Sequence, residues 1–406
     1  MAQTLKFGNG TWATKKGSTL AHNDEDGNFK PLPFTTTRST NATRVNKEGL
    51  IELVGGNQPR VDYKDSEDGV FLLEPSRTNL ITNSNNLTTW NGAAMTRTFI
   101  DDLINPSNVL GASKLTQTSS GGYAWLSRTF TGNETFSAFV KKDSSNFVRL
   151  YAANNTVYFD IVNGTVETEV GSDITDKSII DYGNGWFRIS MSVNSTAASY
   201  VRIYPASSGS SSSGTNSLFV YGAQLEQGSY ATSYIPTQGT IQTRVAETAS
   251  GSGNSEVFND SQGVLFANIE NIDGFISVSD GSGSNRITIG RESGQTKRLF
   301  LTASGGSIQT YSNATDWSVG SFDKVLISYK LNDIKIFVNG FLIDTDTSYS
   351  IPSGLNTALF TSGSTNGNFY GKTKEIAYYD TVLTDIELET LTSYRTWEEM
   401  VKELNL

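Results

Sequence analysis

The residues of this chain that could do chemistry are few. A Ser-His-Asp arrangement needs a histidine, and the only one is His22, which we expect to be a solvated or packed loop residue. The same count excludes a histidine-rich metal site. No phosphate-binding glycine loop with a following lysine precedes a helix, and no pattern places two carboxylates as glycosidases need them. We therefore expect no enzymatic activity.

Three aromatic residues are candidates for holding a sugar. Sugars are held by aromatic faces together with planar amide or carboxylate hydrogen bonds. Trp90, Tyr123 and Trp125 lie near turn-rich sequence and could form such a platform. The alternative is that each of them packs in a core.

Two acidic turns offer the clustered oxygen atoms that Ca²⁺ prefers. One contains Asp280, and the other contains Asp344 and Asp346. Acidic turns are also ordinary in β proteins, so the two loops permit Ca²⁺ without requiring it. No other cofactor is expected.

Composition restricts the remaining classes of protein. The 406 residues carry a formal net charge of -10, so binding of nucleic acid through a basic surface is not expected. Without cysteine there is no disulfide or thiolate site. No segment approaches the ~20 apolar residues of a membrane span, and the opening residues lack the apolar run of a signal peptide. We expect a soluble protein without membrane insertion.

Short alternating segments predict an all-β fold. In residues 186–193, Phe187, Ile189, Met191 and Val193 would share one buried face. Asn-Gly pairs at 163–164 and 339–340 each predict a hairpin between two such segments. The pattern favours β-sandwich modules in tandem.

Three consecutive portions are predicted. Residues 1–69 form an N-terminal segment in which Trp12, Phe29 and Phe34 could anchor the chain to another subunit or pack onto the next domain. Residues 70–245 and 246–406 would each form a β-sandwich.

Other segments are assigned from local pattern. The serine-glycine run at 207–214 is predicted to be a loop tip, and the run at 249–254 an interdomain linker. Thr384 and Glu387 make a capping box, which predicts one C-terminal helix that covers the third portion or binds a partner.

Several stretches resemble known families. Residues 73–84 (LEPSRTNLITNS), 183–188 (GNGWFR) and 221–237 (YGAQLEQGSYATSYIPT) resemble a module common in tail and fibre proteins of tailed phages. Residues 42–51 look like the lead-in of such proteins, and residues 7–15 are similar to openings of fibre proteins in crAss-like phages of Bacteroidota. The resemblance implies a carbohydrate-binding-module-like sandwich for the second portion.

The third portion resembles laminin-G-like, pentraxin-like or concanavalin-like sandwiches through residues 336–340 (IFVNG) and 370–380 (YGKTKEIAYYD). The acidic residues that come closest to the catalytic strand motif of concanavalin-like glucanases are Glu270 and Asp273. Their spacing differs from that of the motif, and the final acid of the motif is missing. In the first family motif, Glu74 could pair with Arg77.

Together these features predict a structural phage virion protein. We expect a head fibre or capsid decoration at the particle surface, assembled in the host cytoplasm, that displays glycan-adhesive sandwiches. The expected partners are capsid or other virion proteins and host cell-surface glycans, and the resemblance implies a homotrimer. A tail-associated receptor-binding lectin is the alternative, and a glycan hydrolase is a weaker one.

Overall fold

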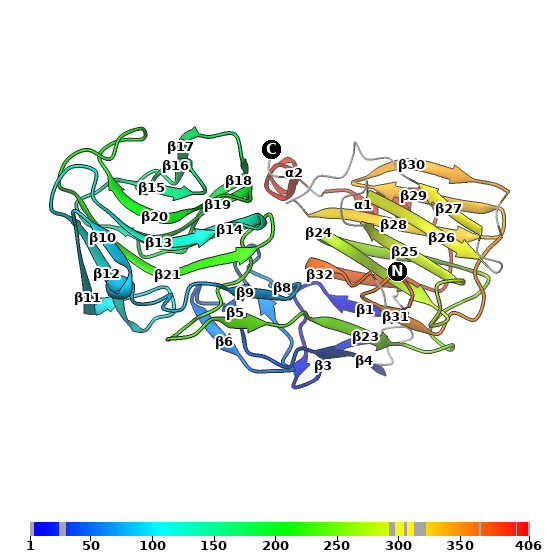
Figure 1. Cartoon of the computed structure of the whole chain (residues 1–406). Coiled ribbons are helices and arrows are strands. Elements are labelled where there is room, and N and C mark those ends of the chain that lie inside the picture. The colour runs from blue at the N-terminus through cyan, green and yellow to red at the C-terminus, as the bar shows by residue number, and fades with distance from the viewer. Residues whose placement is uncertain are drawn as a thin grey trace. The chain divides into compact units, whose positions relative to one another are not determined.

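The computed structural model describes residues 4–23, 30–291, 297–303, 307–311, 322–348, 350–364, 367–394 and 396–404. Its elements are nearly all strands, which confirms the predicted all-β class (Figure 1). The chain divides into two compact units, each made of separated segments. Unit 1 comprises Met1–Ser39, Val54–Pro75 and Ala246–Leu406, and unit 2 comprises Thr40–Leu53 and Ser76–Val245.

Unit 2 is a sandwich of two six-stranded antiparallel sheets. The first, which we call the β20 sheet, has the order β10 (Asn91–Ala93), β13 (Tyr123–Thr129), β20 (Ala198–Ala206), β15 (Phe147–Ala152), β16 (Asn155–Asp160) and β17 (Thr165–Val170). The second, the β14 sheet, has the order β11 (Met95–Ile104), β12 (Leu110–Gln117), β21 (Ser217–Gln227), β14 (Gly132–Lys142), β19 (Trp186–Ser195) and β18 (Ile174–Asp181). The small elements are β5 (Ala42–Val45) with β6 (Ile51–Val54), β9 (Arg77–Asn79) with β22 (Gln242–Arg244), and the 3₁₀ turn η2 (Leu87–Thr89).

The core of unit 2 follows from strand alternation. In β19, Ile189, Met191 and Val193 are fully buried in that core, and Phe187 packs against it half-buried, as predicted. Val201 and Ile203 of β20 reach the same core from the opposite sheet. Because side chains alternate across a strand, the residues between them must lie on the other face.

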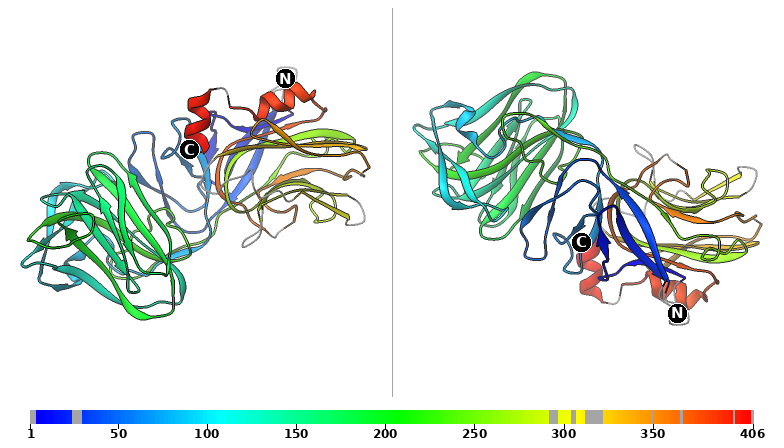
Figure 2. Two further views of the ribbon diagram at one scale, coloured as in Figure 1. Left: turned by 90° about the horizontal axis from the view of Figure 1, so that it is seen from above. Right: turned by 90° about the horizontal axis from the view of Figure 1, so that it is seen from below.

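Unit 1 contains one extended sheet that closes into two layers (Figure 2). Its main path runs through β27 (Ser307–Tyr311), β26 (Lys297–Ala303), β25 (Arg286–Arg291), β24 (Gln262–Ser279), β31 (Thr357–Leu359), β23 (Thr248–Ser252), β4 (Lys30–Thr37), β3 (Ser18–Asn23), β1 (Leu5–Gly8), β32 (Tyr370–Tyr379), β8 (Val70–Leu73) and β7 (Val61–Asp62). Branches are β2 (Thr14–Lys15) on β3 and β28 (Asp323–Lys330), β29 (Asp333–Val338) and β30 (Phe341–Asp346), which extend from β24.

The long strand β24 belongs to both layers. Its first half pairs with β28 and β32, and its second half pairs with β25 and β31. The change comes at register shifts near Asn271 and Asp273 and at Gly274, whose φ is +78°. A Cβ at Gly274 would lie 1.8 Å from the Asn368 carbonyl oxygen, so the turn between the layers requires glycine.

The N-terminal segment differs from the predicted separate portion, because 1–69 is divided between the two units. β1 pairs with β32 at the far end of the chain, with Leu5 opposite Tyr378 and Phe7 opposite Ile376. Leu5 and Phe7 are fully buried in the core of unit 1. A strand with an apolar face and unpaired backbone groups is stabilised by joining a sheet, whatever its distance in sequence.

The predicted linker at 249–254 is wrong. Residues Thr248–Ser252 form β23, which pairs with β4 and β31, and Ala249 is fully buried. The run of small residues was mistaken for low complexity, although Ala249 and Ser252 in it are fully buried. The serine-glycine run at 207–214 does lie in a loop between β20 and β21, as predicted.

Both predicted hairpins form, with different turns. β29 and β30 are joined by Asn339 (φ 50°) and Gly340 (φ +87°), the two left-handed residues of a type I′ turn. β16 and β17 instead pair Asp160 with Thr165, which leaves a four-residue turn. The Asp160 carboxylate accepts the N–H groups of Val162 and Asn163 and so sets the longer loop.

Two helices replace the single predicted one. The capping box at Thr384 and Glu387 is present and begins α1 (Asp385–Thr392), which ends at Ser393, and α2 (Trp397–Leu404) follows. Leu388 of α1 is buried against β24, β28 and β32, so this helix covers unit 1. Neither helix has the length and apolarity needed to cross a bilayer, among the residues described.

Candidate functional site

The β20 sheet has an unusual outward face. Val148, Leu150, Val201 and Ile203 point into the core, so the residues between them on β15 and β20 point outward. These outward positions hold arginine and tyrosine, and they continue onto β13 and β16. We call the set the aromatic–arginine face, which comprises Tyr123, Trp125, Arg149, Tyr151, Tyr158, Tyr200, Arg202 and Tyr204.

Strand register places these side chains in rows. Trp125 of β13 lies opposite Arg202 of β20, which lies opposite Tyr151 of β15. In the next row, Tyr204 of β20 lies opposite Arg149 of β15, which lies opposite Tyr158 of β16. Directly opposed side chains are about 4.5–5.5 Å apart at Cβ, so each row makes continuous contacts.

Arg202 is at the centre of the face. Its guanidinium lies over the rings of Tyr151 at 4.4 Å, Tyr200 at 4.6 Å and Tyr123 at 4.7 Å from the ring centroids. Nη1 donates to the Tyr204 hydroxyl at 3.1 Å. Burial opposes the charge, but the hydrogen bond to Tyr204 and the surrounding hydroxyls raise the pKa of Arg202 above its usual value. The side chain is therefore a fixed cation.

Arg149 repeats this arrangement on the neighbouring strand. Its guanidinium lies 4.4 Å from the Tyr204 ring centroid and 5.7 Å from that of Tyr158, and Nη2 donates to Thr156 Oγ1 at 3.1 Å. Tyr204 thus contacts both arginines, and burial raises its pKa. Cation–π contacts of this kind stabilise by about 0.5–2 kcal/mol each.

The aromatic rings also contact one another. Tyr123 lies 4.7 Å from Tyr204, and Trp125 meets Tyr200 edge to face at 5.0 Å between ring centroids. Tyr204 and Tyr158 are buried beneath the guanidiniums, whereas Tyr123, Trp125, Tyr151 and Tyr200 stay partly exposed. The face therefore offers both aromatic surface and hydrogen-bond donors to an external molecule.

A hollow lies at one end of the face. It has a volume of about 320 Å³ and is lined by Ser127, Arg128, Thr129, Ala198, Ser199 and Tyr200. Its lining is mostly hydroxyl-bearing, which suits a small polar group next to the tyrosine ring.

Two of the three predicted sugar-binding residues lie together in the structure, and the third is excluded as a candidate. Tyr123 and Trp125 lie on the aromatic–arginine face. Trp90 is 2% exposed and packs in the core of unit 2 near Phe136, so it is not available to a ligand. Its position after η2, rather than on a strand of the β20 sheet, turns its ring inward.

The predicted calcium ligands hold their own turns. Asp280 accepts hydrogen bonds from Ser282 and Asn285, Asp344 from the Thr345 N–H, and Asp346 from Ser348. Within the described ranges, no three acidic or histidine side chains gather as a metal site would need. Ca²⁺ binding at these turns remains a sequence-based prediction.

The predicted anchoring residues mostly serve the core of unit 1. Phe34 is 1% exposed and meets Phe7 and Phe360 edge to face, so it cannot anchor a partner. Trp12 packs half-buried on Phe7 and donates from Nε1 to the Asp68 carbonyl at 2.7 Å. Phe29 lies outside the described residues.

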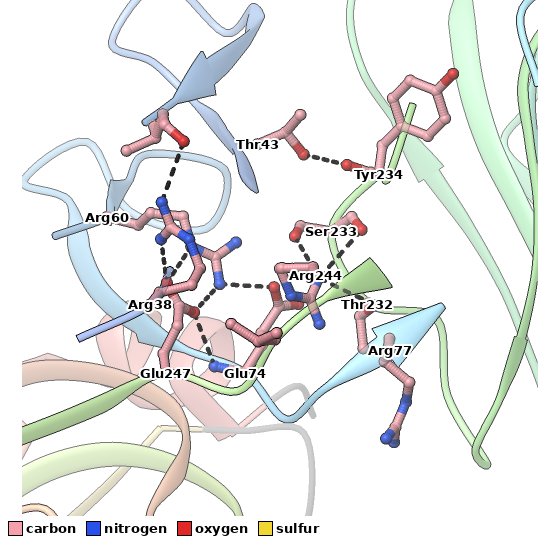
Figure 3. A network of polar contacts seen from close by, with 12 residues as sticks. Arg38, Thr43, Arg60, Glu74, Arg77, Thr232, Ser233, Tyr234, Arg244 and Glu247 are labelled. Atoms are coloured by element: carbon pink, nitrogen blue, oxygen red, sulfur yellow. Dashed lines mark hydrogen bonds and ion pairs between the residues drawn. The ribbon is translucent and has the colours of Figure 1, made fainter. Parts of the chain in front are cut away.

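A second arginine cluster, in unit 1, has the opposite character (Figure 3). Arg38 Nη1 contacts Glu247 at 2.5 Å, and Arg60 pairs with both Glu247 and Glu74, the latter at 2.8 Å. Burial would lower the pKa of Arg60, but the two carboxylates raise it above its usual value. We call these four residues the buried ion network. Every charge in it is matched and inaccessible.

The motifs at 73–84 and 221–237 hold the entry and exit of the sandwich of unit 2. The Asn79 amide donates to the carbonyls of Ala223 and Ile235, while its oxygen accepts from Ile81 and Leu225. Tyr234 is buried, and its hydroxyl lies 2.6 Å from Ser84 Oγ.

The predicted pairing of Arg77 with Glu74 is wrong. Arg77 lies 3.8 Å from the buried Glu226 instead, and Glu74 pairs with Arg60. Nearby in unit 2, Arg244 donates to the Ser233 hydroxyl at 2.9 Å (Figure 3). The motif is therefore architectural.

The arginines and most tyrosines of the candidate face were not predicted from the sequence. The signal was present as alternation: Arg149 and Tyr151 in one strand, and Tyr200, Arg202 and Tyr204 in another, always two positions apart. This alternation places the arginine and tyrosine side chains of each strand on one face.

Comparison with known proteins supports the fold. Residues 264–389, within unit 1, match the family Laminin_G_3, described as the concanavalin A-like lectin/glucanases superfamily. This is less than half of the chain and does not include the aromatic–arginine face. A search of curated proteins gave no match.

Several solved structures are similar in part. The CBM40 of Ruminococcus gnavus IT-sialidase bound to α2,3-sialyllactose has a TM-score of 0.30 and 19% identity, over 34% of this chain and 86% of that one. Domain 4 of the GH43 arabinanase AbnA from Geobacillus stearothermophilus has a TM-score of 0.29 and 14% identity, over 41% and 83%. Trypanosoma rangeli sialidase has a TM-score of 0.27 and 10% identity, over 92% and 65%. Similarities of this size carry no argument about ligand or mechanism.

Proposed function

We propose that this protein is a non-catalytic saccharide-binding component of a tailed-phage particle. The observation that carries the binding role is the aromatic–arginine face of unit 2. Partly exposed rings of Tyr123, Trp125 and Tyr151 surround the donors of Arg202 on a rigid sheet. A site built on strands holds its groups in place better than one built on loops.

The chemistry of the face suits a sugar. The ring C–H surface of a saccharide packs on aromatic rings, and its hydroxyls accept hydrogen bonds from guanidinium N–H groups and exchange them with tyrosine hydroxyls. The sheet is preorganised by its own cation–π and ring contacts, so little side-chain entropy is lost on binding.

The absence of catalysis is part of the proposal. The only histidine, His22, lies in strand β3 of unit 1 and not in the predicted loop. On β16, the Asp160 carboxylate accepts three hydrogen bonds from its own turn, two from the Val162 and Asn163 N–H groups and one from the Asn163 amide. A glycosidase mechanism needs a pair of carboxylates with different roles, and the aromatic–arginine face supplies arginines and tyrosines for contact instead.

The particle role is supported by the phage-type motifs of unit 2. Their residues, including Asn79 and Tyr234, make the contacts that close the sandwich, so the resemblance concerns the whole module. We assign the protein to a head fibre or capsid decoration, because no long repeat or coiled-coil shaft occurs in the sequence. The alternative is a tail-associated receptor-binding lectin.

A glycan array tests the binding role. The full chain should bind a restricted set of saccharides, and Trp125→Ala should lower that binding at least about tenfold, the worth of a buried aromatic contact of about 1.4 kcal/mol. The matched control is Trp397→Ala, which removes a tryptophan that is 72% exposed on α2 of unit 1. Silence of the wild-type chain on the array, or equal losses in both variants, would reject the face as the site.

Labelled antibody on intact particles tests the location. Labelling of the head supports the decoration role. Labelling confined to the tail would overturn the head assignment in favour of the receptor-binding alternative, and no labelling of particles would reject the virion role altogether.

A further inference from the structure

The two arginines of the aromatic–arginine face carry charges that the protein does not neutralise. Among the described residues, neither Arg149 nor Arg202 has a carboxylate within ion-pair distance. They lie on adjacent strands, and both contact Tyr204, through its ring and its hydroxyl respectively. Two like charges this close repel each other, so the arrangement costs stability unless an anion joins it.

The stacked geometry leaves the binding edges of the guanidiniums available. A guanidinium presents five N–H donors in its plane, while its flat surface packs on aromatic rings. Arg202 uses one donor on Tyr204, and Arg149 uses one on Thr156. Each Nε is buried without a hydrogen bond, but both side chains as a whole remain partly exposed. The terminal amino groups are therefore oriented by the rings and free to donate to an external oxyanion.

The positive charges of Arg149 and Arg202 contrast with the net negative charge of the whole chain. The sequence has a net charge of -10, so an acidic polymer is repelled by most of the surface. A pair of unmatched guanidiniums on an otherwise acidic protein gives such a polymer one favourable contact area.

We infer that the saccharide bound by this face is acidic, held through an oxyanion, a carboxylate or a sulfate, on Arg149 and Arg202. This inference rests on the proposed function and specifies its ligand class. Planar carboxylate matches the guanidinium fork in two parallel hydrogen bonds, and sulfate offers oxygens at similar spacing. Aromatic contact with Trp125 and Tyr151 then holds the sugar ring beside its acidic group.

The test compares matched saccharides on the full chain. Oligogalacturonate is offered beside the same oligomer after its carboxyl groups are reduced to alcohols, and a sulfated galactan beside its desulfated form. We expect the acidic member of at least one pair to bind about tenfold or more tightly than its neutral counterpart, because a hydrogen bond to a charged group exceeds a neutral one. The carboxylated and sulfated pairs distinguish the two oxyanions.

Variants connect the selectivity to the two arginines. Arg202→Gln and Arg149→Gln should each lower affinity for the acidic saccharide about tenfold more than affinity for its neutral counterpart, because the neutral sugar loses only a hydrogen bond whereas the acidic one also loses the charge interaction. Lys177→Gln, which removes one positive charge from β18 of the other sheet in the same unit, should change neither. A circular dichroism spectrum like that of the wild-type chain and a cooperative melting transition establish that each variant is folded.

The outcomes separate the two proposals. Tight binding of neutral saccharides with no acidic preference overturns this inference and leaves the proposed function standing. Binding of acidic saccharides that survives both arginine substitutions also overturns it. Failure of the chain to bind any saccharide, acidic or neutral, overturns both.

Discussion

The two arginine clusters of this protein place the same side chain in different environments, one buried among carboxylates and the other partly exposed on tyrosine rings. In the buried ion network, Arg38 and Arg60 are fully buried and share the Glu247 carboxylate, and Arg60 also pairs with Glu74. On the aromatic–arginine face, Arg149 and Arg202 are partly exposed and rest on tyrosine rings. A buried guanidinium is stable only with an anion of the protein beside it. An exposed guanidinium does not need such a partner and can bind an anion from solution.

The comparison also shows how each cluster relates to the chain. The buried ion network joins residues from three separate sequence segments of unit 1, because Arg38, Arg60 with Glu74, and Glu247 come from different ones. The face is made from neighbouring antiparallel strands of one sheet. The first cluster therefore specifies how distant segments assemble, and the second presents a surface on a scaffold that is already complete.

The largest effect is expected at the carboxylate that the buried arginines share. Glu247→Gln leaves Arg38 and Arg60 with too little negative charge, and we expect unit 1 to lose about 3–5 kcal/mol of its free energy of unfolding. Hydrogen exchange read by mass spectrometry in urea reports each unit separately. Glu52→Gln at the half-exposed Arg44–Glu52 pair is the control, with an expected loss of about 0.2–1 kcal/mol. Equal losses of unfolding free energy in the two variants would contradict the conclusion that buried arginines depend on their ion partners more than exposed ones do.

A smaller effect on stability is expected at the centre of the face. Arg202→Gln removes its cation–π contacts but also relieves repulsion with Arg149, so unit 2 should lose about 1 kcal/mol or less. The same exchange measurement applies. A loss as large as that of Glu247→Gln would mean that Arg202 is a structural residue, and the binding role of the face would need another explanation.

Two substitutions of Tyr151 distinguish the contribution of its ring from that of its hydroxyl. Tyr151→Phe removes the hydrogen bond to Asn154 Oδ1 but keeps the ring under Arg202, so we expect stability to change by about 0.5 kcal/mol and saccharide affinity by about twofold at most. Tyr151→Leu removes the ring and should weaken binding further. Titration calorimetry with the best saccharide of the array decides, and a larger effect of the Phe variant than of the Leu variant would contradict the stacking role.

The smallest expected effect is that of pH. Burial raises the pKa of Tyr204, so its hydroxyl keeps its proton well above neutral pH, and the pKa of Arg202 is also raised above its usual value. The charges of these two residues therefore stay constant from about pH 6 to pH 9, and affinity for an acidic saccharide should vary by about twofold at most over this range. A clear titration step near neutral pH would indicate that another group takes part.

Local chemistry made part of the fold predictable from sequence. The left-handed conformation that Asn339 and Gly340 adopt without strain defines a two-residue hairpin, and the alternation in 186–193 defines a buried strand face. The capping box at Thr384 marks a helix start, because the Thr384 side chain accepts the Glu387 N–H at the first turn. Each of these depends on a few neighbouring residues.

The rest depends on partners that are distant in sequence. The pairing of Leu5 with Tyr378 and the assembly of Glu247 with Arg38 are fixed by tertiary contacts that no local pattern contains. The candidate site shows the same limit: Tyr123 and Trp125 were identified as aromatic residues near turns, but Arg202 gains its role only when β20 lies between β13 and β15. Trp90 was equally plausible by sequence and lies in the core.

The most direct measurement is a structure of the full chain with an acidic saccharide bound, determined by crystallography or cryo-electron microscopy. We predict density for a sugar ring against Trp125 and Tyr151, with its acidic group within hydrogen-bond distance of Arg202 or Arg149. Saccharide density elsewhere on the protein, with these side chains in contact only with water, would contradict the account.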